Sequence, residues 1–142
     1  GSEIGAAAKN VMGIAAGMLD GGGYTTLKGP LMARGAREIS RLIGAMGGKE
    51  ISAYGLCHLG DYETTLFSPF SHNRKFGEDY VKGVKFNKLA EGVATCKAIK
   101  LLGKKYSVDM PITNAVYSIL YENKEPMQAF LSVFSRSTRK EF

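Results

Sequence analysis

Residues 4–19 restrict the possible fold more than any other segment, because they are apolar or small at nearly every position. A helix with apolar residues on all faces must be covered on every side, and its Gly and Ala residues let neighbouring helices approach closely. The segment is too short and too interrupted to cross a membrane. We therefore predict a central helix over residues 4–19, covered by other helices or by a second chain, and no membrane span.

Lys9 is the only charged residue in this helix. Burying an unpaired ammonium group costs several kcal/mol. The side chain can avoid this cost by extending past its small neighbours to water. Alternatively, it stays desolvated, and a desolvated lysine is suited to act as a general acid or base. The residue pattern alone favours neither interpretation.

The rest of the chain repeats apolar residues at helical spacing and contains no alternating strand pattern of useful length. Pro30 and Pro111 fit the first turns of helices, where the missing N–H is harmless. We expect the polar tail from residue 135 to fray. We predict an all-α fold with further helices over residues 27–46, 88–105, 111–121 and 126–134, a helix whose last part is residues 78–83, and a short helix at roughly 49–55.

Helical spacing also predicts which side chains face the core. Within residues 27–46, we expect the apolar residues, including Ala33, to point inward and the charged residues, including Glu38, to lie mostly on the wet face. Within residues 88–105, we expect Leu101 to point inward and the row of lysines to form a solvated face.

The 142 residues, 44% of them hydrophobic, suffice for one globular domain with a sizeable core. We interpret Gly1 and Ser2 as the remnant of a cleaved tag.

The formal charge of +6 favours an anionic partner such as a phosphorylated metabolite, a nucleotide or a nucleic acid. Cys57 and Cys96 lie far apart in a chain without a signal peptide, so we expect reduced thiols in a cytoplasmic protein.

Several kinds of site lack their sequence signature. No Gly-x-Gly-x-x-Gly segment follows a strand, so no dinucleotide-binding half is visible. The cysteines and histidines do not fall at zinc-site spacing, and we expect no metal. No nucleic-acid-binding motif stands out, and the aromatic residues are not interleaved with basic ones, so we expect no nucleic-acid partner.

Residues 55–77 concentrate polar, small and basic residues between apolar anchors. Asp61 follows Gly60 directly, and a run rich in hydrogen-bond donors follows at residues 71–75. A carboxylate near several donors and cations suits a small, anionic, hydroxylated ligand. The alternative is that Asp61 caps a helix and residues 68–75 form a solvated loop. Taken alone, this segment favours the alternative.

Together with Lys9, however, these segments resemble the C-terminal substrate domain of NAD(P)-dependent glycerol-3-phosphate dehydrogenases over about residues 3–134. The segments that carry the resemblance are Ala8-Lys9-Asn10-Val11, Gly60-Asp61 with Thr65, Ser68-Pro69, Ser71-His72-Asn73-Arg74-Lys75-Phe76-Gly77, Glu91-Gly92-Val93, Met110-Pro111-Ile112-Thr113-Asn114-Ala115-Val116-Tyr117 and Leu120-Tyr121-Glu122. They follow the order that they have in the family.

The resemblance implies a multi-helix bundle of the 6-phosphogluconate dehydrogenase C-terminal-domain-like type, forming one substrate-binding domain over residues 3–142. It implies the interconversion of sn-glycerol 3-phosphate and dihydroxyacetone phosphate with NAD or NADP, which supplies phospholipid precursors. The cofactor would be held mainly by an N-terminal dinucleotide-binding domain that is absent from this chain. We expect this chain alone to be inactive, its partner to be a small phosphorylated substrate, and the protein to form a homodimer.

The resemblance also assigns roles around the reacting carbon. Lys9 would be the acid/base that exchanges a proton with the C2 oxygen of the substrate. Asp61 would position Lys9 and hydrogen-bond the substrate. Asn10 and Thr65 would bind the substrate close by.

Further roles concern the phosphate and the cofactor. Ser71, His72 and Asn73 would hold the substrate phosphate, where several donors act together. His72, Leu89 and Glu91 would contact the nicotinamide cofactor.

Three features depart from the family pattern. The family has arginine at His72 and glycine at His58, and its connection between Gly83 and Glu91 is longer. An imidazole does not replace a bidentate, always-charged guanidinium without loss. The alternative function is therefore a catalytically degenerate helical module that binds anions or serves dimerisation.

Overall fold

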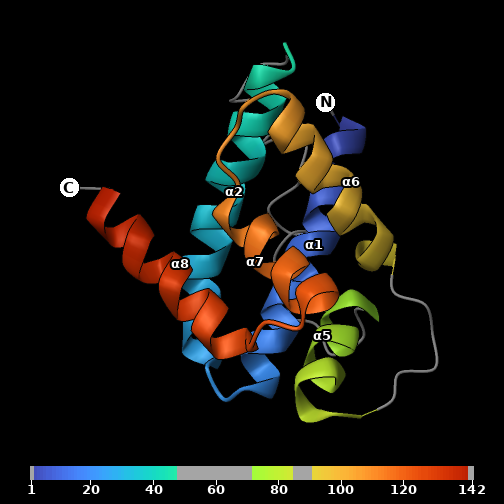
Figure 1. Ribbon diagram of the computed structural model, residues 1–142, viewed down its shortest axis with the longest axis vertical. Coiled ribbons are helices and arrows are strands. Elements are labelled where there is room, and N and C mark those ends of the chain that lie inside the picture. Colours follow the sequence, from blue (N-terminus) through green and yellow to red (C-terminus); the bar gives the residue numbers. More distant parts are fainter. Residues whose placement is uncertain (1, 48–71, 85–90, 141–142) are drawn as a thin grey trace.

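The computed structural model describes residues 2–47, 72–84 and 91–140, and every regular element in these ranges is a helix (Figure 1). The predicted all-α class is confirmed for this part of the chain. The short helix predicted near residues 49–55 lies outside the described residues. The elements are α1 (Ser2–Gly21), the 3-10 turn η1 (Thr25–Leu27), α2 (Lys28–Ala45), α5 (His72–Lys82), α6 (Glu91–Lys105), α7 (Pro111–Glu122) and α8 (Pro126–Lys140).

Helix α1 is the centre of the bundle, as predicted. Every residue from 11 to 19 is buried. In Figure 1, α2 and α8 lie on one side of α1, and α5 and α6 lie on the other. Helices α2, α5, α6 and α7 all pack against α1. The burial of α1 is thus achieved within one chain and does not require a second one, and the homodimer stays a prediction.

The contact between α1 and α5 depends on two glycines. A Cβ at Gly77 of α5 would overlap the carbonyl oxygen of Ile14, and a Cβ at Gly17 of α1 would overlap the carbonyl oxygen of Arg74. Backbone atoms cannot rotate out of the way as a side chain can. The small residues of both helices therefore set how closely α5 approaches α1, as the composition of residues 4–19 predicts.

The helix ends follow local backbone chemistry in most places. Gly23, with a φ of 83°, ends the turn after α1. Pro30 and Pro111 lie in the first turns of α2 and α7, as expected. Helix α7 ends at Asn123, which adopts the left-handed conformation that asparagine tolerates. Helix α8 continues to Lys140, whereas the prediction ended it at residue 134.

Three predictions of side-chain direction were wrong. Ala33 is exposed because it lies two positions from the buried Leu31, on the opposite side of α2. Leu101 is 55% exposed for the same reason, since it is two positions from the buried Ile99. Glu38, expected on the wet face, is completely buried, because its carboxylate meets the start of α7.

Candidate functional site

Three helices meet where the first turns of α5 and α6 pack against α1. Asn73, in the first turn of α5, is 9% exposed, and its Oδ1 accepts a hydrogen bond of 3.0 Å from the N–H of Gly92. A Cβ at Gly92 would lie 2.6 Å from Ile14 Cδ1 and 3.0 Å from the Asn10 carbonyl oxygen. We call Asn10, Ile14, Asn73 and Gly92 the three-helix junction.

The hydrogen bond to Gly92 fixes the orientation of the Asn73 amide. A backbone N–H only donates, so the atom that faces it is the amide oxygen rather than the nitrogen. The two N–H groups of the Asn73 amide therefore point elsewhere, as donors for another acceptor. Asn73 thus satisfies a first-turn N–H of α6 and still offers donors to a ligand.

The junction also brings two helix N-termini together. Asn73 lies in the first turn of α5 and Gly92 in the first turn of α6, and the two residues touch. Helix N-termini carry a partial positive charge, which favours a nearby anion. This arrangement is suited to a phosphate group.

Lys9 and Asn10 lie side by side on α1, and both are half-buried. Lys9 forms no hydrogen bond or ion pair with any residue in the described part of the chain. Its side chain is therefore neither fully desolvated nor fully in water, and both interpretations of the sequence remain compatible with its position. Being next to Asn10 in the sequence, it lies at the edge of the three-helix junction.

The structure describes only some of the predicted site residues. His72 is exposed and begins α5, directly before Asn73. Glu91 begins α6, directly before Gly92. The predictions for Asp61, Thr65, Ser71 and Leu89 lie outside the described residues, as does the side chain of Glu91. Asn10, Asn73 and the start of α6, which are far apart in the sequence, are brought together.

Arg74, a basic residue of the predicted phosphate run, takes part in an ion-pair network instead. Its side chain is 8% exposed, and Nη1 lies 3.0 Å from Asp20 Oδ2 and 2.7 Å from Glu78 Oε1. The buried Lys28 also binds Asp20 Oδ2, at 2.8 Å. Hydrogen bonds from Lys82 and Arg74 lower the pKa of Glu78 to about 2. Arg74 therefore holds the end of α1 and the start of α2 against α5.

Glu38 is a buried hydrogen-bond acceptor that was not predicted from the sequence. Its Oε1 accepts a 2.8 Å hydrogen bond from the Ile112 N–H. Its Oε2 accepts from the Thr113 N–H at 2.9 Å and from Thr113 Oγ1 at 2.7 Å. Burial raises the pKa of Glu38 to about 7, against the lowering effect of these hydrogen bonds. Glu38 thus caps α7 from another helix.

A weak sequence signal for this cap exists. Met110, at the N-cap position of α7, has no side-chain oxygen to accept a hydrogen bond. The N–H groups that begin a helix must find an acceptor when they are buried. An acceptor from outside the first turn of α7 was therefore required, although the sequence does not indicate which one.

Cys96 is a free, buried thiol, as predicted. Its Sγ donates to the Thr113 carbonyl oxygen at 3.7 Å, and burial raises its pKa to about 12. It is therefore an inert packing residue rather than a nucleophile. Cys57 lies outside the described residues.

Two further findings concern the described ranges alone. They contain no group of three or more His, Cys, Asp or Glu residues arranged to hold a metal ion. They also contain no helix with the length and apolar character that a membrane crossing requires.

Comparison with known proteins matches the chain to one protein family. The family described as "NAD-dependent glycerol-3-phosphate dehydrogenase C-terminus" matches residues 1–131. A glycerol-3-phosphate dehydrogenase (NAD(P)+) of Chlorobium phaeobacteroides is 42% identical over 149 residues, which cover 99% of this chain and 45% of that protein. The enzyme of the same name from Clostridium botulinum strain Alaska E43 gives the same identity and coverage.

A solved structure is also similar. The crystal structure of a glycerol-3-phosphate dehydrogenase from Coxiella burnetii superimposes with a TM-score of 0.86 at 31% identity. The superposition covers 94% of this chain and 43% of that one. The chain therefore spans less than half the length of the relatives that it matches.

Proposed function

Because this chain belongs to the NAD-dependent glycerol-3-phosphate dehydrogenase C-terminal family, we propose that it is the substrate-binding domain of such an enzyme. The reaction proposed is the interconversion of sn-glycerol 3-phosphate and dihydroxyacetone phosphate, which supplies phospholipid precursors. The observation that carries this proposal is the hydrogen bond between Asn73 and Gly92. It supports an anion site, because it joins two helix N-termini beside Asn10 and directs the Asn73 amide oxygen at Gly92, so that the amide N–H groups, which have no partner among the described residues, can donate to a phosphate.

We propose that residues 3–142 form this domain and that a separate dinucleotide-binding domain holds most of the cofactor. The chain spans 45% of the length of its relatives, which leaves room for such a domain in the complete enzyme. When bound, NAD or NADP takes up or supplies the hydride at C2 of the substrate. His72, Leu89 and Glu91 would contact it. The exposed position of His72 at the edge of the junction is compatible with this role.

Lys9 would exchange the proton of the oxygen bound to the same carbon. When dihydroxyacetone phosphate is reduced, the C2 oxygen gains negative charge, and the Lys9 ammonium would donate a proton to it. In the reverse direction, the neutral amine would accept the proton of the C2 hydroxyl. Asp61 would keep the lysine in place, and Asn10 and Thr65 would hydrogen-bond the substrate. The half-buried position of Lys9 supports the role, since the side chain stays within reach of a ligand.

Ser71, His72 and Asn73 would hold the phosphate. The Asn73 amide can donate two hydrogen bonds, and His72 donates one when neutral and two when charged. Arg74 would act indirectly, because its ion pairs with Asp20 and Glu78 hold α5 in place. The phosphate would therefore be bound by several donors and by the first turns of α5 and α6.

The second candidate function is a degenerate module that binds anions or serves dimerisation. The observation that favours it is His72, where the family has arginine. Under this alternative, anion binding would not depend on Lys9 and would weaken steeply with salt for unrelated polyanions.

Turnover in the complete protein separates the two functions. We expect the nicotinamide absorbance to fall when dihydroxyacetone phosphate is added, and Lys9→Ala to lower kcat by about 10²-fold or more. Lys97→Ala, which removes an exposed lysine of α6, serves as the matched control and should leave kcat unchanged. If wild-type protein turns over none of the triose phosphates tried, or if Lys9→Ala stays active, the dehydrogenase assignment fails for this chain.

A further inference from the structure

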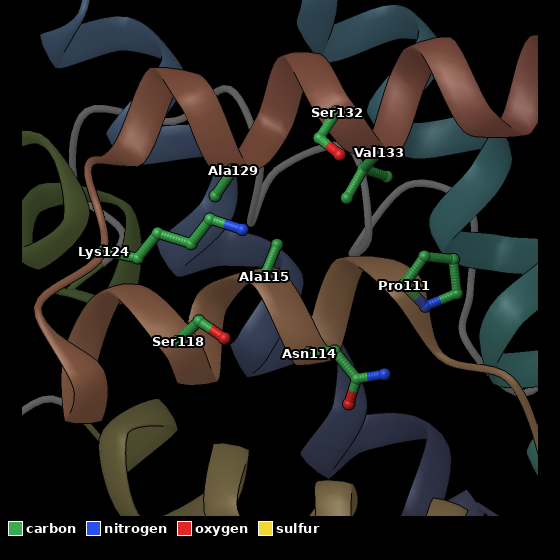
Figure 2. Close-up of a pocket in the computed structure, with 8 residues that line it drawn as sticks. All are labelled: Pro111, Asn114, Ala115, Ser118, Lys124, Ala129, Ser132 and Val133. Atoms are coloured by element: carbon green, nitrogen blue, oxygen red, sulfur yellow. The ribbon is translucent and has the colours of Figure 1, made fainter.

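A cleft of about 160 Å³ lies between α7 and α8 (Figure 2). It contains none of the residues of the three-helix junction or of the proposed reaction. The residues that line it are Pro111, Asn114, Ala115, Ser118, Lys124, Ala129, Ser132 and Val133.

Three polar side chains in this cleft have no use within the described part of the fold. Figure 2 shows the Lys124 side chain extended across the cleft, with its nitrogen between Ala115 and Ala129. The hydroxyls of Ser118 and Ser132 come from α7 and α8. None of these three groups forms a side-chain hydrogen bond or ion pair with another described residue. An ammonium and two hydroxyls therefore share one cleft that is open to solvent, with Lys124 and Ser132 exposed and Ser118 half-buried.

Asn114 also lines the cleft, but Figure 2 shows its amide directed away from α8. Its Oδ1 accepts a 3.1 Å hydrogen bond from the Lys100 ammonium of α6. The donors that the cleft offers are therefore Lys124, Ser118 and Ser132.

Within the described part of the chain, no carboxylate lines the cleft beside these donors. None of the residues that line the cleft is acidic. Glu125 follows Lys124 in the sequence, but its Oε2 accepts a 2.6 Å hydrogen bond from the Gln128 N–H. Glu38 is directed at the N–H groups of Ile112 and Thr113. The cleft thus offers one ammonium and two hydroxyls that can donate to an anion, and no carboxylate among its lining residues repels one.

The cleft is open to solvent and has room for a small anion. At roughly 30 Å³ per water molecule, 160 Å³ equals the space of about five waters. A tetrahedral oxyanion has five heavy atoms and presents oxygens in several directions, which suits three donors from different parts of the chain. We propose that the cleft between α7 and α8 is a second phosphate site, which takes inorganic phosphate or the phosphate end of a phosphomonoester. Lys124, Ser118 and Ser132 are its donors.

Amide spectra of the ¹⁵N-labelled chain test this site without any turnover. We expect titration with inorganic phosphate at constant ionic strength to shift the amides of Ser118, Lys124 and Ser132 in a saturable manner. Lys124→Gln should weaken this binding by about tenfold, because it removes a charge-assisted hydrogen bond. Lys104→Gln, which removes an exposed lysine of α6, should leave it unchanged. Ser132→Ala, a milder change, should weaken binding a few-fold.

The same titration separates this site from the proposed substrate site. Lys9→Ala should leave the shifts at Ser118, Lys124 and Ser132 unchanged, whether or not the dehydrogenase proposal holds. Tighter binding of sn-glycerol 3-phosphate than of inorganic phosphate would identify an ester as the ligand, and equal binding would identify the free anion. The proposal is overturned if these amides show no saturable shift, or if Lys104→Gln weakens binding as much as Lys124→Gln does.

Discussion

Replacing Gly77 by alanine should separate α5 from α1. The new Cβ would overlap the Ile14 carbonyl oxygen and would lie 2.9 Å from the Met18 nitrogen. These are backbone atoms of a buried helix, so α5 must move. Overpacking of this kind costs about 3 kcal/mol, and the better helix propensity of alanine returns about 1 kcal/mol. We therefore expect Gly77→Ala to lower the free energy of unfolding by about 2 kcal/mol.

Gly103→Ala is the matched control for this variant. Gly103 is also buried within a helix, but its Cβ would meet the Met110 thioether at 2.8 Å and Met110 Cγ at 3.2 Å. A methionine side chain adjusts easily, so the strain and the gain in helix propensity should nearly cancel. We expect the stability of Gly103→Ala to stay within about 1 kcal/mol of wild type.

Urea denaturation followed by circular dichroism measures both variants. With a slope of about 1.5 kcal/mol/M, Gly77→Ala should lower the urea midpoint by roughly 1.3 M. Asn73 lies four residues before Gly77 on the same face of α5, so the displacement should also pull its amide away from Gly92. If Gly77→Ala is as stable as Gly103→Ala, the close approach of α1 and α5 is not what positions the junction.

Two further substitutions test charged groups. The pKa of Glu38 is raised from 4.5 to about 7, so the folded state binds more protons than the unfolded state in this window, and stability falls as the pH rises through it. Urea titrations at a series of pH values measure this effect: relative to Glu38→Gln, wild type should lose roughly 3 kcal/mol of unfolding free energy across this window. If the unfolding free energies of the two proteins change with pH in parallel, the reasoning is wrong. His72→Arg should lower the KM for dihydroxyacetone phosphate by about tenfold in the complete enzyme, because a guanidinium is always charged and binds phosphate through two hydrogen bonds. An unchanged KM would show that His72 lies away from the phosphate.

The helices could be predicted from the sequence where local chemistry decides them. The small apolar residues of 4–19 indicate a covered helix, and Pro30 and Pro111 mark where helices begin. Glu38 could not be placed in this way. Its position on α2 resembles that of the neighbouring exposed arginines, and only the three-dimensional arrangement shows that α7 begins opposite its carboxylate.

The site was predictable only in part, for a related reason. Family motifs identified Asn10 and Asn73 as candidates, but no spacing rule indicates that Gly92 would join them 19 residues after Asn73. Arg74 shows the opposite case. Its place in a basic run suggests a phosphate ligand, whereas the approach of Asp20 across 54 residues of sequence engages it in an ion pair.

Asn73→Asp tests the central claim, that the three-helix junction binds the substrate phosphate. Aspartate keeps an oxygen for the Gly92 N–H, and its charge is favourable at the start of α6, so the fold should be retained. It lacks the amide donors and places a negative charge beside the phosphate. In the complete enzyme, we predict a KM for dihydroxyacetone phosphate that rises by about 10²-fold, with an unchanged urea midpoint. An unchanged KM in a folded Asn73→Asp enzyme would contradict the account.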